Sequence, residues 1–367
     1  MASGATEDDE CDPFGGLAND ELASALLEND TDGNHSEEDW DPFGGLTVEE
    51  IGEGLESSDT EDEDDDQLER LGTTTRKQNT IPRDASTLIS SPESAVPRVA
   101  LDEISPETFR KMFLLARRPV VLVDRRATCV PMHITTEYLQ KHHGSREIPL
   151  GFGGPSQQKA VLSDFLAFDD EALKGQYLRN LQMEHWFPDE AKHLKLPAVL
   201  GPNLLADEMR TPHVSATWRN WFELFVCSHH CAGFPFLHQD TCHVHAIGMQ
   251  IQGCKRYIMF PPEDSRFLYT QPPGHTRSDI RDLDDVDPSK YPQFQNANRI
   301  HVDLYPGEIL FCPADWWHTT KCMSMDTPSV TLNASFVDEG NYEAFLDSFC
   351  EFQAMKTLVK HGASVIR

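Results

Sequence analysis

The stretch PFLHQDTCHVH, residues 235–245, places three histidines and one aspartate within eleven positions. His238 and Asp240 are two residues apart, and on an extended segment such residues point to the same side, so an imidazole and a carboxylate can converge. A third ligand can come from a neighbouring strand, because His318 in PADWWHTT stands at the end of the strand-like run EILFCP. Two histidines and one carboxylate form the facial triad that leaves positions open on non-haem Fe(II). We therefore predict that His238, Asp240 and His318 bind a metal.

Three further polar residues lie in segments that are expected to be strands. Lys255 begins the strand in GCKRYIMFPP, where it is either a solvated strand-end cation or a point charge for a cosubstrate carboxylate. Thr331 and Asn333 alternate on SVTLNASF and therefore face the same side. Both can donate hydrogen bonds near the metal, or they form an ordinary polar strand face.

These segments together closely resemble one known family. The residues that carry the likeness are His238-x-Asp240, QGCKRYIMFPP, YPGEILFCPADWWHTT and TLNASF. They resemble the JmjC, cupin-like Fe(II)/2-oxoglutarate oxygenases, and within them the hypoxia-factor asparaginyl hydroxylase and the jumonji lysyl hydroxylases. The likeness covers roughly residues 100–340. It implies a mainly β fold, a double-stranded β-helix (jelly-roll) barrel with flanking helices.

The resemblance also implies roles for single residues. Fe(II) would be held by the three metal ligands, and Lys255 would pair with the distal carboxylate of 2-oxoglutarate, helped by Thr331. Asn333 would lie near the metal or the cosubstrate. Two features depart from the family pattern: Pro235 replaces a hydroxyl residue, and an Asn found in relatives has no counterpart near 246–248. We expect aromatic groups to complete the pocket, with Tyr177 and Trp221 as the candidates.

Two other groups have metal-ligand character. His243-x-His245 is the ligand pattern of other cupins, where an acid follows several residues later, but Gln250 stands near that place. This pair is an alternative metal site, or it consists of polar residues at the mouth. The sequence CSHHC at 227–231 lacks the second half of a tetrahedral zinc site. It is expected to be a strand edge whose thiols pack inward.

The elements that must position these residues follow from the hydrophobic pattern. Ser105 is the expected N-cap of a helix with Pro106 at its first position, followed by a strand at Val120–Val123. A second helix–strand unit is expected at 135–154. From about residue 218, short strands separated by Gly and Pro predict a barrel. The resulting division is 1–95 acidic tail, 96–217 N-terminal part of the catalytic domain, 218–340 JmjC β-helix core and 341–367 C-terminal helix.

The two ends of the chain differ in character. Residues 1–70 hold 26 of the 61 acidic residues and one of the 31 basic residues, so we expect residues 1–95 to be disordered. DPFGGL occurs at 12–17 and at 41–46, either as a duplicated piece of tail or as a pair of motifs that dock unknown proteins. At the C-terminus, an apolar stripe predicts packing against the core or a homodimer seam. The stripe consists of Phe345, Phe349, Phe352, Met355 and Leu358.

Composition limits the classes of function. Outside the tail the chain has no basic footprint for nucleic acid. It also has no apolar run of roughly 18 residues that could span a bilayer. The start, MASGATEDDE, lacks the layout of a secretory signal, and nine cysteines without framework spacing suit reduced thiols. We expect a cytoplasmic or nuclear protein with no direct nucleic-acid or membrane binding.

The resemblance implies an enzyme that hydroxylates a side chain of a protein or peptide substrate and forms succinate and CO2 as co-products. Three alternatives stay open: a lysine or arginine demethylase, a small-molecule hydroxylase, and an inactive binding module. A demethylase would release formaldehyde from methylated peptides, whereas a binding module would form no succinate.

Overall fold

The computed structural model describes residues 96–150, 158–211, 219–270, 276–324 and 326–350. The acidic tail with both DPFGGL copies lies outside these ranges, as does the C-terminal part of the predicted last helix. Among the described residues, no helix is both long enough and apolar enough to cross a membrane.

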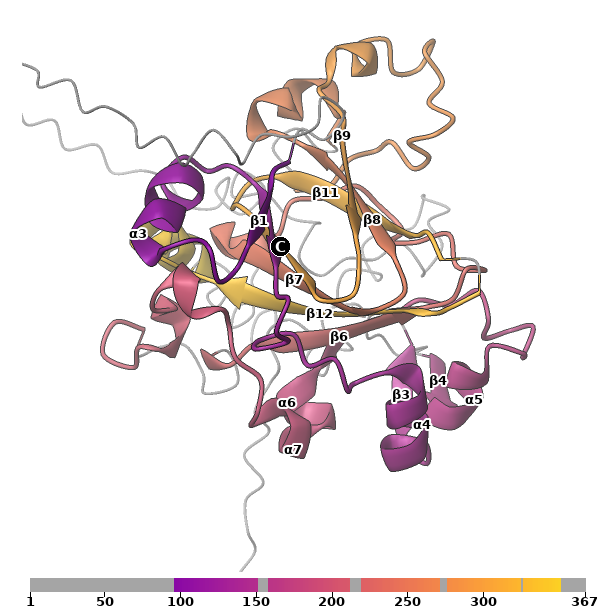
Figure 1. Cartoon of the computed structure of the whole chain (residues 1–367). Helices are drawn as coiled ribbons and strands as arrows, with labels where there is room; N and C mark the ends of the chain where they lie inside the picture. Colours follow the sequence, from indigo (N-terminus) through magenta and orange to yellow (C-terminus); the bar gives the residue numbers. More distant parts are fainter. Residues whose placement is uncertain (1–95, 151–157, 212–218, 271–275, 325, 351–367) are drawn as a thin grey trace, which may run out of the picture.

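Two facing β-sheets form the centre of the molecule (Figure 1). The larger sheet has the strand order β1-β2-β10-β7-β12-β6-β5, and the smaller has the order β11-β8-β9. This arrangement confirms the predicted jelly-roll fold. The larger sheet consists of β1 (Arg98–Ala100), β2 (Val120–Val123), β5 (Leu178–Gln182), β6 (Phe222–Cys227), β7 (His245–Gln252), β10 (Glu308–Cys312) and β12 (Ser329–Phe336). The smaller sheet consists of β8 (Lys255–Phe260), β9 (Ile300–Leu304) and β11 (Trp317–Cys322).

Alternation along the strands of the larger sheet decides what each face contacts. On β7, Ile247, Met249 and Ile251 belong to the main hydrophobic core, which lies between the sheet and the helices. Ala246 and Gly248 point the other way, toward the smaller sheet. Because apolar side chains fill the outer face, the inner face of the barrel is free to carry polar groups.

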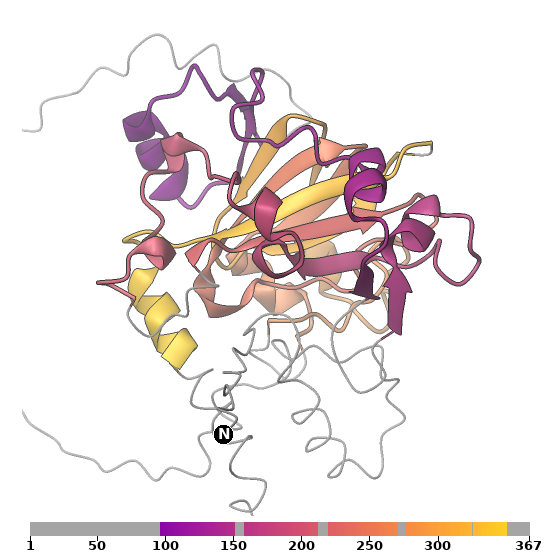
Figure 2. The ribbon, with the colours of Figure 1, turned by 90° about the horizontal axis from the view of Figure 1, so that it is seen from below.

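Helices cover the outer face of the larger sheet (Figures 1 and 2). Ser105 caps the first helix as predicted, its hydroxyl accepting from the Thr108 amide, and Pro106 is the first helical residue. The predicted single helix is divided into an α and a π segment. The helical segments are α3 (Pro106–Phe109), η3 (Arg110–Leu114), α4 (Thr136–His143), α5 (Leu162–Ala167), α6 (Met183–Trp186), α7 (Pro188–Ala191), η4 (Ala198–Leu200), η5 (Leu204–Ala206), η6 (Thr241–His243), η7 (Pro262–Phe267) and η8 (Phe294–Asn296).

The second predicted helix–strand unit is present as α4 and β3 (Glu147–Leu150), which pairs with β4 (Gln158–Val161). At the other end of the chain, a helix begins at residue 342 and continues to the end of the described range. Its Phe345 and Phe349 are buried against Trp221 and Val244. These two positions are therefore core, and the rest of the stripe lies outside the described residues.

Candidate metal centre

His238 and His318 lie directly opposite each other on paired backbone segments. The amide of His238 donates to the carbonyl of His318 at 3.1 Å, and the amide of His318 donates back at 2.7 Å. Such a pair places two side chains side by side on one face. The expectation that His318 stands at the end of the EILFCP strand is wrong. That strand, β10, ends at Cys312 in the larger sheet, and His318 lies on β11 in the smaller sheet.

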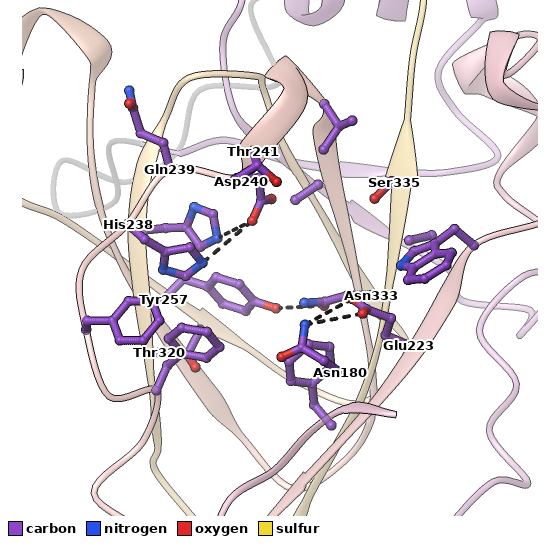
Figure 3. A pocket seen from close by; sticks show the side chains of 18 of the residues that line it. Asn180, Glu223, His238, Gln239, Asp240, Thr241, Tyr257, Thr320, Asn333 and Ser335 are labelled. Carbon is purple, nitrogen blue, oxygen red and sulfur yellow. Dashed lines mark hydrogen bonds and ion pairs between the residues drawn. The ribbon is translucent and has the colours of Figure 1, made fainter. Parts of the chain in front are cut away.

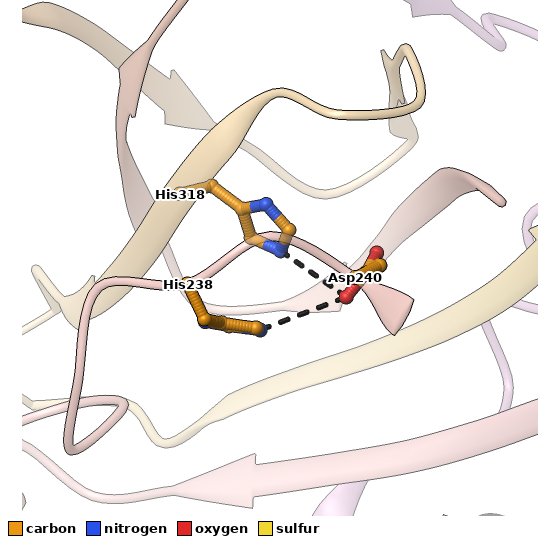
Figure 4. A group of neighbouring side chains, drawn as sticks. All are labelled: His238, Asp240 and His318. Carbon is orange, nitrogen blue, oxygen red and sulfur yellow. Dashed lines mark ion pairs between the residues drawn. The ribbon is translucent and has the colours of Figure 1, made fainter. Parts of the chain in front are cut away.

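The three predicted ligands converge on one point (Figure 4). The Nε2 atoms of His238 and His318 lie 3.6 and 3.7 Å from Oδ1 of Asp240, and the three ligand atoms all lie within 4.8 Å of one another. These distances are too long for good hydrogen bonds. They suit three ligands arranged around one cation. Among the described residues, this is the only such cluster of His, Cys, Asp and Glu.

The charge state of the centre also suits a cation. Burial alone would raise the pKa of Asp240, but the neighbouring His318 and His238 outweigh it and hold the pKa below its usual value. Burial lowers the pKa of His318, although Asp240 opposes this. A carboxylate anion and a neutral imidazole are the forms that coordinate metals.

Neighbouring groups fix the orientation of both imidazoles. His318 places Nδ1 3.1 Å from the carbonyl oxygen of Trp316, so Nδ1 carries the proton and Nε2 faces Asp240 with its lone pair. The ring of His238 stacks on Phe234, with centroids 4.5 Å apart and planes 16° apart. Both Nε2 atoms are thus presented on one side.

Lys255 lies at another end of the same pocket. Its side chain is 1% exposed, and Nζ donates to the hydroxyl of Tyr177 at 2.9 Å. The ammonium also lies over the rings of Tyr177 and Phe225. Because the residue is buried, the interpretation as a solvated cation is wrong. Burial also lowers the pKa of Lys255 to about 8. Tyr177 is a direct neighbour of this lysine, and Thr320, which the sequence interpretation missed, lies 3.4 Å from the Tyr177 hydroxyl.

The other two predicted contacts differ from each other. Asn333 lines the pocket, where the Tyr257 hydroxyl lies 3.4 Å from Asn333 Oδ1. Thr331 is fully buried, and its hydroxyl donates to Oε1 of Gln250 at 2.8 Å. Thr331 is not one of the described residues that line the pocket. Trp221 does line the pocket.

The alternative histidine pair does not meet the other ligands. Nδ1 of His243 lies 2.5 Å from Oδ1 of Asp315, and Nε2 of the buried His245 lies 3.4 Å from Oδ1 of Asp338. Nδ1 of His245 accepts from the backbone amide of Ala314 at 2.9 Å. The interpretation of this pair as the metal site is therefore wrong.

Asp315 connects the loop that carries His238 and Asp240 with the segment that precedes β11 and His318. Its carboxylate contacts His243 and also Arg117, at 2.8 Å, and its carbonyl accepts from the side chain of Gln239 at 2.5 Å. Gln239 lies between the ligands His238 and Asp240. Arg117, His243 and Asp315 all have positive φ, so the loops meet here in conformations that non-glycine residues rarely adopt.

The CSHHC segment has the predicted inward thiols. Cys227 and Cys231 are buried beside Tyr177 and Phe225, whereas His229 and His230 are exposed. The eight cysteines in the described ranges are free thiols.

The pocket has a polar side that the sequence interpretation missed. Asn180 and Glu223 line it across from His238 and Asp240, and the ring of Tyr257 extends between the two sides (Figure 3). Glu223 lies in the run WFELFVC, where a single acid among apolar residues was a signal of a buried polar role. Asn180 had no such signal, because its position depends on an irregularity in β5.

Comparison with known proteins finds partial similarity to two kinds of protein. HSPB1-associated protein 1 of Rattus norvegicus is 41% identical over 100 residues, which cover 25% of this chain and 20% of that protein. The HSPB1-associated protein 1 homolog of Danio rerio is 27% identical over 259 residues, covering 63% of this chain and 54% of the relative. tRNA wybutosine-synthesizing protein 5 of Gallus gallus is 26% identical over 244 residues, covering 62% and 73%. This chain thus spans between a fifth and about half of the HSPB1-associated relatives.

Residues 106–340 match the family described as "Cupin-like domain". This range is more than half of the chain and contains the smaller sheet, every strand of the larger sheet except β1, and all three converging ligands. The protein therefore belongs to the cupin-like, JmjC-type domain family.

Proposed function

We propose that this protein is an Fe(II)- and 2-oxoglutarate-dependent oxygenase that hydroxylates a side chain of a protein substrate, with succinate and CO2 as co-products. The observation that carries the proposal is that one pocket combines the His238, Asp240 and His318 cluster with the buried ammonium of Lys255. Family membership alone does not define an activity, whereas the chemistry of these side chains supports one.

The donor set supports Fe(II). Two imidazole nitrogens and one carboxylate oxygen are the ligands of the facial triad. The cluster faces the pocket, so ligands other than protein atoms have access to its open side. The carbonyl of Trp316 holds His318 with Nε2 toward Asp240, which prepares this ligand before any metal arrives.

The environment of Lys255 supports a dicarboxylate cosubstrate. A buried ammonium is costly unless an anion compensates it, and Nζ of Lys255 donates to the neutral hydroxyl of Tyr177. A carboxylate placed beside Nζ and the Tyr177 hydroxyl would accept two hydrogen bonds there. Thr320 is close enough to contribute a third donor.

When bound, Fe(II) and 2-oxoglutarate supply the oxidising chemistry, with dioxygen as the co-reactant. The residues of the chain would bind and orient the metal and the cosubstrate, and they would exclude water from the pocket. Lys255 and Tyr177 orient the cosubstrate by its far carboxylate. Phe234 and Phe236 line the pocket beside His238 and keep that side dry.

Succinate formation by the purified full chain tests the proposal. We expect succinate to form only with Fe(II) and 2-oxoglutarate together, and a +16 Da product on a protein substrate identified by mass spectrometry of cell extracts. His238→Ala should abolish succinate formation without unfolding the protein. Formaldehyde release from methylated peptides would instead identify a demethylase, and no succinate under any condition would favour a binding module.

A second candidate is hydroxylation of a modified nucleoside in RNA. It is favoured by the similarity, over 62% of this chain, to a relative named tRNA wybutosine-synthesizing protein 5. The absence of nucleic-acid binding therefore stays a prediction. Incubation with total tRNA followed by nucleoside mass spectrometry distinguishes the two substrates. The relatives named HSPB1-associated protein 1 make association with HSPB1 a further proposal for this chain. Location in the cytoplasm or nucleus is also a proposal.

A further inference from the structure

Three cysteines lie beside Lys255, and the proposed function uses none of them. Cys227 is the last residue of β6, Cys231 lies in the loop that follows, and Cys322 is the last residue of β11. We call these three residues the thiol cluster. Cys227 and Cys231 are buried in one small hydrophobic cluster, and Cys322 packs against it. The cluster therefore joins an end of the larger sheet to an end of the smaller sheet.

Both sheets direct their thiols toward the ammonium of Lys255. Cys322 is directly paired with Lys255 across β11 and β8, so the two side chains lie on the same face of the smaller sheet. On β6, Cys227 follows Phe225 by two residues and points to the same side. The ring of Phe225 lies 5.3 Å from Nζ of Lys255. The lysine accordingly interacts electrostatically with all three cysteines.

The loop that carries Cys231 is held firmly against β11. The amide of Phe234 donates to the carbonyl of Thr320 at 2.8 Å. Gly233 has φ +105°, and a Cβ atom at this position would lie 2.1 Å from the same carbonyl oxygen, so the close approach requires glycine. Sγ of Cys231 accepts from the amide of Gly233 at 3.4 Å. The positions of the thiols are thus set by the backbone around them.

The three thiols differ in reactivity. Hydrogen bonds with Cys231 and Cys322 raise the pKa of Cys227, and burial adds to this. The bond with Cys227 lowers the pKa of both Cys322 and Cys231, although burial opposes it. Cys322 is partly exposed, whereas Cys227 is 1% and Cys231 8% exposed. Because an accessible thiolate is the reactive form of cysteine, Cys322 is the member that a soluble oxidant attacks first.

We propose that Cys322 and Cys227 form a peroxide-sensitive pair that closes to a disulfide beside Lys255. The thiolate of Cys322 attacks hydrogen peroxide, an S–O bond forms as the O–O bond breaks, and the other oxygen leaves as water. The sulfur of Cys227 then attacks the resulting sulfenic acid, the S–O bond breaks, and a second water takes the thiol proton. Two thiols and one peroxide thus give one disulfide and two waters.

The position of the pair connects it to the cosubstrate site. A dicarboxylate bound at Lys255 would add negative charge beside Cys322 and disfavour its thiolate. Oxidation of the pair should therefore be slower when 2-oxoglutarate is bound. This connection rests on the proposed function, whereas formation of the disulfide does not.

The test uses the reduced full chain without iron or 2-oxoglutarate, treated with a stoichiometric amount of hydrogen peroxide. Peptide mapping by mass spectrometry without reduction should find a peptide pair linked through Cys227 and Cys322, and dithiothreitol should separate it. At neutral pH, iodoacetamide should alkylate Cys322 at least about tenfold faster than Cys129, because a thiolate and not a thiol is the nucleophile. Cys129 is also a partly exposed free thiol, but burial raises its pKa.

Two variants separate the steps. Cys227→Ala should stop the reaction at the sulfenic acid of Cys322, which dimedone traps as an adduct of defined mass. Cys322→Ser should abolish both the adduct and the linked peptide. Cys129→Ser is the matched control, and it should form the disulfide as the unaltered protein does.

Absence of the linked peptide in the unaltered protein would overturn the proposal. A disulfide between Cys227 and Cys231, or alkylation of Cys129 as fast as that of Cys322, would overturn the assignment of Cys322 as the reactive thiol. The same experiment with 2-oxoglutarate should show slower formation of the disulfide. An unchanged rate would contradict the proposed cosubstrate site at Lys255 and leave the thiol pair intact.

Discussion

Two pairs of histidines lie close together in this fold, and they differ in what their nitrogens contact. His238 and His318 face Asp240 at distances too long for hydrogen bonds. His243 and His245 each have a carboxylate of their own, from Asp315 and Asp338. The residue types are the same in both pairs.

The difference teaches that ligand sites are found where the fold leaves polar groups incompletely satisfied. His245 is closed off by Asp338 and by the amide of Ala314, so it has no lone pair left for a metal. Within the part of the chain that the structure describes, no carboxylate is hydrogen-bonded at short range to Nε2 of His238, to Nε2 of His318 or to the buried ammonium of Lys255. The two histidine nitrogens can therefore bind a cation, and the lysine ammonium can bind an anion.

The largest expected effect concerns the ligand pair itself. His318→Ala should abolish binding of Fe(II), because the triad loses one of three donors while the backbone pairing of His318 with His238 remains. His243→Ala should keep one bound metal per chain. Anaerobic equilibrium dialysis with metal analysis measures both. Retained Fe(II) binding in His318→Ala, or loss of Fe(II) binding in His243→Ala, would contradict the assignment of the metal site to the first pair.

The next effect concerns Lys255. Replacement by Met should weaken binding of 2-oxoglutarate by about 10- to 100-fold, as for the loss of a hydrogen bond to a charged group. The pKa of Lys255 is about 8 because the group is buried, and a bound dianion must raise it. Below pH 8 the lysine is already protonated, so affinity should be flat there. Above pH 8 binding must take up a proton, so affinity should fall as pH rises.

Calorimetric titration across this pH range checks the prediction, with Lys255→Met as the reference that should show no such fall. An affinity for 2-oxoglutarate that is insensitive to the Met substitution would show that another cation binds the cosubstrate.

A smaller effect is expected for the internally satisfied pair. His245→Ala removes a buried ring and leaves the Ala314 amide and the Asp338 carboxylate without this partner. The free energy of unfolding should fall by about 2–4 kcal/mol. Urea denaturation measures it, with the exposed His133→Ala as the control. Metal stoichiometry of the folded fraction should not change, and a lost metal would show that the second pair does contribute to the site.

The smallest effect should come from the link between the two pairs. Asp315→Asn removes the carboxylate that contacts His243 and Arg117, so the loop carrying His238 and Asp240 is held less firmly. We expect the dissociation constant of the metal to rise about tenfold, the size typical of residues that support ligands indirectly. Asp303→Asn is the matched control. The side chain of Asp303, on β9, is 29% exposed against 28% for Asp315, and it pairs with Arg256 on β8. Equal changes in both variants would rule out a positioning role.

Much of the site could be predicted because its ligands are marked by local spacing. His238 and Asp240 are two positions apart on extended backbone, and Lys255 stands at the start of a strand. The helix cap at Ser105 is also a purely local feature. Asn180 and Glu223 could not be predicted in the same way. Their contact depends on a register shift between β5 and β6, and a shift of one residue moves a side chain to the other face.

The amino-acid sequence by itself determined the residue types that can hold a metal, the alternation that buries one face of each strand, and the acidity of the tail. Only the tertiary structure decided which histidines meet. His318 faces His238 because β11 lies in the smaller sheet, eighty residues further along the chain, and the two backbones pair there. His243 and His245 are nearer to Asp240 in the chain, but they turn to other carboxylates. Local spacing sets the direction of a side chain, whereas contacts between distant strands depend on packing of the whole barrel.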